Sequence, residues 1–261
     1  PLYDKPLIYY PLSVLMLAGI KNILIIVNKG QLYQFKKILP EKNNLGIKIQ
    51  YKEQTKPNGL PDAFLLGEKF IEKDNIALIL GDNFFYGQSL TKILQKNISI
   101  KNGAKIFLHP VKNPNLYGVA TIDKNKKVIN LVEKPKKTKS NLAITGLYFF
   151  DNKVIKFAKQ LKPSARNELE ITDLLKKYKK LNKLSADYIG RGGAWLDAGS
   201  IDDYYDTTSF VSAIQKRQGF KIACLEEIAL TKKWINKNTL KESIKFYGNC
   251  DYSKYLRRLL F

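Results

Sequence analysis

Cysteine, methionine and histidine are scarce in this sequence of 261 residues, which has two, one and one of them respectively. Cys224 and Cys250 cannot form a disulfide framework and lie in no C-x-x-C spacing, so we expect a reduced, cytoplasmic setting and no metal held by sulfur. The single histidine, His109, has no nucleophile at a catalytic spacing and is expected to be structural. No apolar run is long enough to span a membrane, and we expect no membrane partner.

Acidic residues are also few, because 23 Asp and Glu stand against 45 Lys and Arg, for a net charge of +22. Such a field attracts nucleic acids and other anions. The excess consists mostly of scattered lysine pairs, however, and forms no continuous stripe interleaved with aromatic residues. We therefore expect no nucleic-acid partner. A basic nucleic-acid binder stays as an alternative, which salt-dependent retention of DNA would support.

The order of apolar segments predicts an α/β fold. Strands are expected at 22–27, 47–54 and 76–80, with helices at 6–19, 30–39, 59–71 and 89–98, an order that is typical of a layered parallel sheet. The first of these helices is expected to kink at Pro11. After residue 103 we expect a strand at 104–111, a hairpin turning at 123–126, a strand at 141–151 and helices at 152–161 and 170–182. The prediction is a Rossmann-like, mixed, mostly parallel sheet flanked by helices over residues 1–200, with a helical extension of the same domain over 201–261.

Two acidic residues follow apolar segments directly. Asp82 comes after the buried run 76–80 and Gly81, and Asp197 ends the segment "AWLD" before another glycine. Ligands of open α/β sheets lie beyond the carboxyl ends of the strands, where such residues stand. If they converge, the two carboxylates suit Mg²⁺, which takes one or two carboxylates together with water and phosphate oxygens. Spacing alone leaves the alternative of two independent turn residues open.

A family resemblance extends along nearly the whole chain. It is carried by the ordered blocks "YDKPLIYYPLSVLMLAGI", "PNGLPDAF", "LGDNFFYG", "NLYGVATID", "VEKPKKTKSNLAITGLYFFD", "LKPSARNELEITD", "WLDAGS" and "RQGFKIACLEEIA". The sequence resembles the bacterial glucose-1-phosphate thymidylyltransferases, which make dTDP-glucose from dTTP and glucose 1-phosphate on the way to dTDP-rhamnose and surface polysaccharides. The blocks "SARNELEITD" and "SNLAITGLYFFD" favour this family over related enzymes that use UTP or ATP.

The resemblance implies roles for particular residues. It assigns Asp82 and Asp197 to Mg²⁺, and Gln54, Gly59 and Leu60 to the thymine base, for whose edge an amide can both donate and accept. The residues that it assigns to the sugar and its phosphate are Tyr117, Gly118, Glu133, Lys134, Gly146, Tyr148 and Arg166, with Trp195 packing beside the loop of Asp197. Lys134 and Arg166 are the implied catalytic cations, since an ionised phosphate attacks without a base.

The neighbours Glu133 and Lys134 raise a question of geometry. Successive side chains of a strand point to opposite faces, so one of the two has to leave the strand if both are to reach a ligand. Pro135 directly after them predicts an irregular strand end.

Members of this family begin with a strand and a glycine-rich loop, G-G-x-G-T-R-L, which do not precede Pro1 in this sequence. We expect the chain alone to be poorly stable and inactive with dTTP, and two apolar strand edges to lack a partner. Equal activity of an upstream-extended version would contradict this. The resemblance implies a homotetramer. A UTP-dependent uridylyltransferase and a truncated, non-catalytic sugar-nucleotide-binding module stay open as alternatives.

Overall fold

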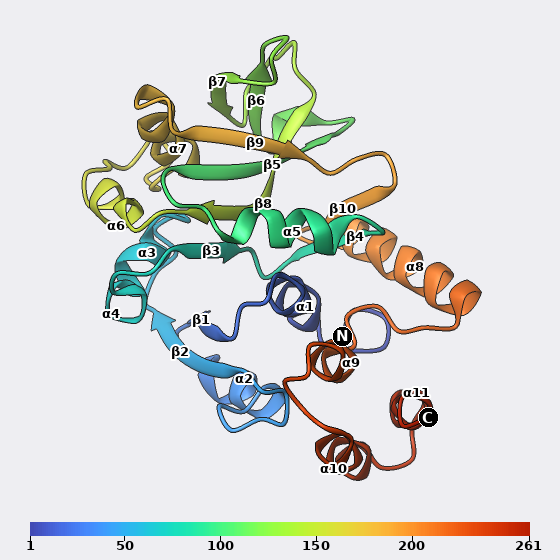
Figure 1. The fold of residues 1–261 in the computed structure, drawn as a ribbon. Helices are drawn as coiled ribbons and strands as arrows, with labels where there is room; N and C mark the ends of the chain where they lie inside the picture. Colours follow the sequence, from blue (N-terminus) through green and yellow to red (C-terminus); the bar gives the residue numbers. More distant parts are fainter.

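The computed structural model describes residues 1–261 as strands in the centre of the molecule with helices around them (Figure 1). The strands are β1 Asn22–Asn28, β2 Lys48–Gln54, β3 Ile76–Ile79, β4 Asn83–Gly87, β5 Ala104–Pro110, β6 Gly118–Ile122, β7 Val128–Glu133, β8 Leu142–Phe150, β9 Leu184–Tyr188 and β10 Gly193–Asp197. The α-helices are α1 Tyr9–Ala18, α2 Leu32–Ile38, α3 Asp62–Leu66, α4 Glu68–Ile71, α5 Leu90–Ile98, α6 Lys153–Ala158, α7 Ile171–Lys180, α8 Ile201–Gln218, α9 Leu225–Thr231, α10 Lys237–Tyr247 and α11 Asp251–Arg258.

The largest sheet has six strands in the order β7-β6-β8-β5-β9, with β3 also paired to β8. β3 and β5 both run antiparallel to β8, and β9 runs parallel to β5, so β3, β5 and β9 share one direction. β6 and β7 form the antiparallel hairpin expected around residues 123–126. The predicted α/β class, a mixed sheet flanked by helices, is confirmed.

Both faces of this sheet are covered, which explains the unbroken apolar runs in its strands. Alternate residues of β5 and β8 pack on one face against α3, α6 and α7, and the others pack on the opposite face against α1 and α5. Eight of the nine residues of β8 are buried as a result. Each fully buried large apolar side chain contributes roughly 1.5–3 kcal/mol to folding.

Two smaller sheets flank the large one. β1 and β2 are parallel, with Asn22 opposite Lys48 and Asn28 opposite Gln54. β4 and β10 are antiparallel, and their last pair is Asn83 with Asp197. One edge of β1 and one edge of β3 pair with no strand, as expected from the family resemblance, and a cavity of about 760 Å³ with both apolar and polar walls lies between them.

Three local details differ from the sequence prediction. The helix expected across 59–71 is divided into α3 and α4 at Gly67. The first helix starts at Tyr9, so Pro11 lies in its first turn, where a missing N–H is tolerated, rather than at an internal kink. The strand β4 was not predicted, because only Phe84, Phe85 and Tyr86 follow Asn83 before Gly87 and their partner strand β10 is far away along the chain.

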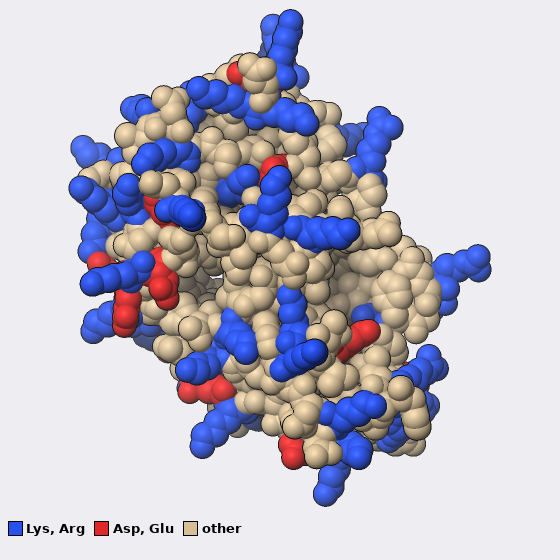
Figure 2. Space-filling view, viewed as in Figure 1, with Lys and Arg blue, Asp and Glu red and all other residues tan.

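Residues 201–261 contain the four helices α8 to α11 and no strand. α9 packs on α1, and its Leu225 and Ala229 belong to the apolar cluster that includes β1 and β2. The lysine and arginine side chains are scattered over the face shown in Figure 2, with acidic residues in a few small groups between them. No helix has both the length and the apolar character that a membrane span requires.

Candidate active site

The side chains of Asp82 and Asp197 converge on one space. Asp82 lies in the turn between β3 and β4, and its carbonyl oxygen accepts a hydrogen bond of 2.9 Å from the N–H of Ala198, the residue after Asp197. A β-carbon added to Gly199 would lie 3.1 Å from Asp197 Oδ1 and 3.7 Å from Asp82 Oδ2. Both carboxylates therefore border the same small volume, which Gly199 leaves free.

The environment of Asp197 is short of hydrogen-bond donors. Burial, and next to it the charge of Asp82, raise the pKa of Asp197 to about 6. Its Oδ1 is buried and has no hydrogen-bond partner. An orphaned carboxylate oxygen beside a second carboxylate fits a bound cation, and a set of two carboxylates fits Mg²⁺ in particular. The chain has no group of three or more His, Cys, Asp or Glu side chains that could hold a metal.

Asn83 was not among the predicted site residues, although its side chain is hydrogen-bonded to three of them. Its side-chain amide donates to Asp82 Oδ1 at 2.8 Å, and its Oδ1 accepts from the backbone N–H of Gly146 at 3.0 Å and from Trp195 Nε1 at 2.6 Å. The only sequence signal was a polar residue inserted between Asp82 and an apolar strand.

Lys134 leaves the strand as its position before Pro135 predicted. β7 ends at Glu133, and Lys134 has a φ of +37°, which a non-glycine residue rarely adopts. Its N–H donates to the carbonyl oxygen of Tyr117 at 3.1 Å. The charge of Lys134 acts on both Glu133 and Asp197, lowering the pKa of each carboxyl group against the larger effect of burial.

Glu133 lies directly opposite Gly118, with its carboxylate next to the space that a side chain at Gly118 would fill. The two residues are paired across β6 and β7, and a β-carbon on Gly118 would lie 3.2 Å from Glu133 Oε2. That oxygen is buried without a hydrogen-bond partner, and the pKa of Glu133 is raised by burial and then by the charge of Glu170. A buried carboxylate oxygen with a free lone pair is suited to accept from a sugar hydroxyl.

Arg166 lies in the same region, held by carboxylates. Its guanidinium is 3.0 Å from Glu168, 3.6 Å from Glu170 and 3.8 Å from Glu133. Ser164 Oγ accepts from the Arg166 N–H at 3.1 Å and donates to Glu170 at 2.7 Å, which fixes the start of this loop. The structure therefore brings Arg166 and Glu133 together.

The aromatic candidates pack in two groups. Tyr117 lies 5.2 Å from Trp195 between ring centroids, and His109 contacts the same indole at 6.2 Å. Trp195 and His109 thus pack behind Asp197, as expected for structural residues. Tyr148 is buried on β8 beside Phe150, and burial, followed by the charge of Glu133, raises its pKa.

The residues implied for the base lie between β2 and α3. Gln54 ends β2, and its Nε2 donates to Asn28 Oδ1 at 2.8 Å. Leu60 packs against the core cluster that contains α3. A β-carbon on Gly59, whose φ is +102°, would lie 2.2 Å from the carbonyl oxygen of Leu169, and the Leu169 N–H donates to the Asn58 carbonyl at 2.7 Å. The loop of Gly59 is thereby joined to the loop of Arg166.

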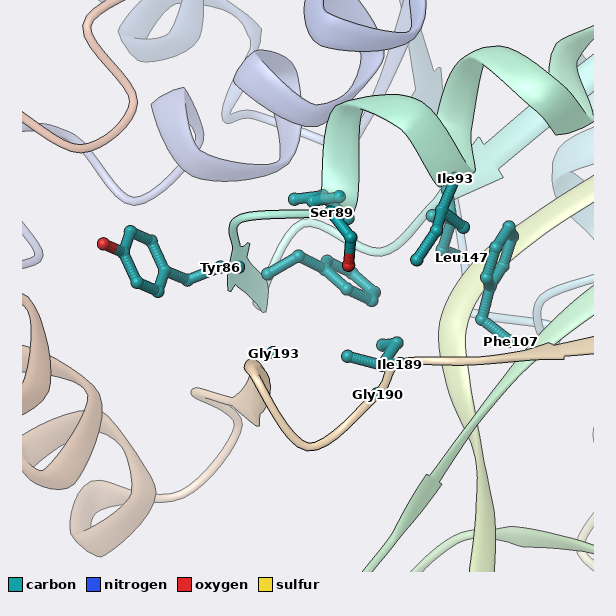
Figure 3. Close-up of a pocket in the computed structure, with 11 residues that line it drawn as sticks. Tyr86, Ser89, Ile93, Phe107, Leu147, Ile189, Gly190 and Gly193 are labelled. Carbon is teal, nitrogen blue, oxygen red and sulfur yellow. The ribbon is translucent and has the colours of Figure 1, made fainter.

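A separate apolar cavity, of about 10 Å³, lies between β4, α5 and the end of β9 (Figure 3). Ile93, Phe107, Leu147 and Ile189 surround it, whereas the Tyr86 ring extends away from it in Figure 3. Neither Asp82 nor Asp197 lines it. This cavity has room for about one water molecule and is distinct from the site of the two aspartates.

Comparison with known proteins agrees with this arrangement. Residues 1–213 match the family model described as "Nucleotidyl transferase". The chain belongs to the nucleotidyl transferase family. A glucose-1-phosphate thymidylyltransferase of Neisseria meningitidis is 48% identical to this family member over 260 residues, which are 100% of the chain and 90% of the relative. The corresponding protein of Mycolicibacterium smegmatis is 43% identical over 260 residues, again 100% and 90% of the two chains.

Solved structures give the same family. A crystal structure of a Bacillus anthracis protein assigned as a glucose-1-phosphate thymidylyltransferase has a TM-score of 0.74 and 36% identity, covering 80% of this chain and 84% of that one. A UDP-glucose pyrophosphorylase in complex with UDP-glucose has a TM-score of 0.69 and 25% identity, covering 83% and 89%. The family resemblance identified from the sequence blocks is confirmed.

Proposed function

We propose that this nucleotidyl transferase moves a thymidylyl group from dTTP to α-D-glucose 1-phosphate, giving dTDP-glucose and pyrophosphate. The single observation that carries the chemistry is the convergence of Asp82 and Asp197 beside Gly199. The substrates are taken from the relatives named glucose-1-phosphate thymidylyltransferase, seven of which are 42–48% identical to this chain.

In the proposed reaction an oxygen of the sugar phosphate forms a bond to the α-phosphorus of dTTP. The bond from that phosphorus to the bridging oxygen of the β-phosphate breaks, and pyrophosphate leaves with the electron pair. The attacking phosphate is already ionised at neutral pH, so no side chain has to remove a proton from it. Catalysis therefore consists of alignment and charge neutralisation.

Different residues near the two aspartates would bind the metal ion and neutralise the phosphates. Asp82 and Asp197 would hold Mg²⁺, which supplies positive charge to the nucleotide phosphates. Lys134, whose charge already acts on Asp197, would neutralise the phosphates as the new bond forms. Arg166 would exchange its exposed partner Glu168 for the planar, bidentate contact that guanidinium makes with phosphate.

Substrate recognition would use the remaining candidates. Glu133 would offer its unpaired oxygen to the sugar hydroxyls. Tyr117, Gly118, Gly146, Tyr148 and Trp195 are the other residues that the resemblance assigns to this side of the site. Gln54, Gly59 and Leu60 would take the thymine. Residues 1–200 form the proposed catalytic core and 201–261 a helical extension of the same domain. We also propose that the enzyme is a cytoplasmic homotetramer that serves dTDP-rhamnose and surface polysaccharide synthesis.

Pyrophosphate release with dTTP and glucose 1-phosphate, compared with UTP, tests this proposal in the upstream-extended version. We expect dTTP to be preferred, and Asp82→Asn and Asp197→Asn each to reduce turnover at least 100-fold, which is the order expected for lost metal ligation. Asp206→Asn, on an exposed part of α8, is the matched control and should keep full activity.

Other outcomes would favour the alternatives. Faster turnover with UTP would replace the proposal by a uridylyltransferase, the activity suggested by the similarity to UDP-glucose pyrophosphorylase. Binding of dTDP-glucose in calorimetry without any turnover in the extended version would instead favour a non-catalytic sugar-nucleotide-binding module.

A further inference from the structure

We propose that Asn83 is the positioning residue of the site, a single buried amide that fixes the relative geometry of Asp82 and Asp197. It is the first residue of β4 and only 1% exposed, and it is hydrogen-bonded to Asp82, to Gly146 in the middle of β8 and to Trp195 in the middle of β10. The inference rests on the proposed function, because it concerns the two residues proposed to hold Mg²⁺.

The hydrogen-bond partners determine which way the amide of Asn83 points. The backbone N–H of Gly146 and the indole N–H of Trp195 can only donate, so the group that faces both of them has to be the amide oxygen. The NH₂ group is then directed at Asp82 Oδ1, 2.8 Å away. Turning the amide over would leave three polar groups without a partner, at a cost of about 1–3 kcal/mol for each buried one.

This orientation also determines how Asp82 presents its carboxylate. Asp82 Oδ1 is occupied by the amide, and Oδ2 is the oxygen that faces the space beside Gly199 together with Asp197 Oδ1. Asparagine does this without adding charge. A lysine or arginine in the same place would compete with a cation, and a carboxylate would repel Asp82.

The oxygen of the same amide fixes β10. Trp195 precedes Asp197 by two residues on β10, and Asn83 is the residue paired with Asp197 across the two strands. The indole hydrogen bond therefore prevents β10 from sliding along β4. On β8, a β-carbon at Gly146 would lie only 2.5 Å from the Asn83 oxygen, so the amide occupies the space that a side chain there would need.

The experiment measures the affinity for Mn²⁺, used in place of Mg²⁺, by electron paramagnetic resonance in the presence of dTDP-glucose. We expect Asn83→Ala to weaken Mn²⁺ binding about 10- to 100-fold, the usual effect of losing a residue that orients a metal ligand. Trp195→Phe removes only one donor and should weaken Mn²⁺ binding in the same direction by a smaller factor. Trp195→Phe provides a second test of the inference if Asn83→Ala does not fold.

Asn97→Ala is the matched control. Asn97 is 5% exposed, and its amide also donates to a carboxylate, Asp187 Oδ2, at 2.7 Å, but no candidate site residue contacts it. Both alanine variants should lose similar thermal stability, while only Asn83→Ala changes Mn²⁺ binding. A second readout is the indole N–H resonance, because the chain has only two tryptophans. Asn83→Ala should shift the Trp195 peak and leave the Trp234 peak in place.

The outcomes separate the inference from the proposed function. If Asp82→Asn weakens Mn²⁺ binding but Asn83→Ala leaves it unchanged, the positioning role of Asn83 is wrong and the metal site stands. An equal loss in Asn97→Ala and Asn83→Ala would also overturn the inference, because the effect would then be global. If Asp82→Asn leaves Mn²⁺ binding intact, the proposed metal site fails and the inference fails with it.

Discussion

The carboxyl group of Asp197 is partly buried and lies near the carboxylate of Asp82. Its pKa therefore differs between the folded and the unfolded protein. Its pKa of about 6 in the folded protein lies above the ordinary value of 3.8 for an aspartate. The folded state therefore binds the proton more tightly than the unfolded state does. The stabilisation by protonated Asp197 is present below about pH 4 and is lost as the pH rises to about 6.

A pH series of melting temperatures tests this effect in metal-free buffer. We expect Asp197→Asn and the unchanged protein to melt at similar temperatures near pH 4, with the variant becoming the more stable of the two between pH 4 and pH 7. Asp206→Asn, at an exposed position, serves as the control and should show no such trend. A constant difference between Asp197→Asn and the unchanged protein across this range would contradict the assignment.

Gly146 is a second residue whose environment permits a sharp prediction. A β-carbon at this position would lie 2.5 Å from Asn83 Oδ1 and 2.8 Å from Leu80 Cγ. Gly146→Ala should therefore lower the free energy of unfolding by about 1–3 kcal/mol, as overpacking does, although alanine is otherwise favoured over glycine in a strand. Urea denaturation measures this. Gly190→Ala, where a β-carbon meets nothing within 4 Å, should have little effect.

The sequence predicted those site residues that directly follow the end of an apolar segment. It did not predict Asn83, whose role depends on tertiary contacts. Asp82 and Asp197 were found because each comes directly after an apolar segment, and Pro135 predicted that Lys134 leaves its strand. The hydrogen bonds of Asn83 reach β8 and β10, which are 63 and 112 residues away along the chain. No local pattern contains that information.

Among the elements, the β6–β7 hairpin contains an unfavourable backbone conformation. The Lys126 N–H donates to the Asp123 carbonyl, and Lys126 has a φ of +62°, a region in which glycine is favoured. Lys126→Gly should raise the free energy of unfolding by about 0.5–1 kcal/mol.

Lys124→Gly is the matched control for this prediction, because Lys124 lies in the same turn and is not among the residues with positive φ. It should lower the free energy of unfolding by up to about 1 kcal/mol, since glycine gains only freedom in the unfolded chain. Thermal unfolding of both variants measures the difference, and the same sign of change in both would contradict the turn conformation.

Helices and strands were predicted best where the hydrophobic periodicity of a segment agrees with the turn residues at its ends. The hairpin, the helices after residue 152 and the buried strands of the sheet all appear as expected. The division into α3 and α4 at Gly67 was missed because a glycine inside an apolar helical pattern is compatible with a continuous helix. β4 was missed because its pairing with β10 comes from a segment 110 residues away.

For the whole molecule, Glu226 is one of the residues that attach the last two helices to the rest. It is 3% exposed on α9 and accepts hydrogen bonds from Tyr247 of α10 at 2.8 Å and from Tyr252 of α11 at 2.6 Å. Glu226→Ala leaves the Tyr247 hydroxyl without its acceptor and the Tyr252 hydroxyl with only Cys224 Sγ at 3.5 Å, and should cost roughly 2–4 kcal/mol of stability.

Denaturant unfolding measures this cost, and limited proteolysis should show earlier cleavage between α9 and α11 in the variant. Glu242→Ala, at an exposed position of α10, should stay within about 0.5 kcal/mol of the unchanged protein. Unchanged protection of the last two helices in Glu226→Ala would contradict the attachment.

The α/β class of the molecule was predictable from its alternation of segments, whereas the two strand edges that pair with nothing were expected only from the family resemblance. The direction of β8 was not, because it depends on which neighbours the strand finds in the sheet and not on its own residues.

The close approach of Gly59 to Leu169 has a mechanical consequence. The loop implied for the base and the loop of the proposed phosphate-binding arginine touch through main-chain atoms, with no side chain between them to give way. A displacement of one loop is therefore expected to move the other loop as well. Occupation of the proposed base subsite would then change the position of the Arg166 guanidinium, which is proposed to bind phosphate.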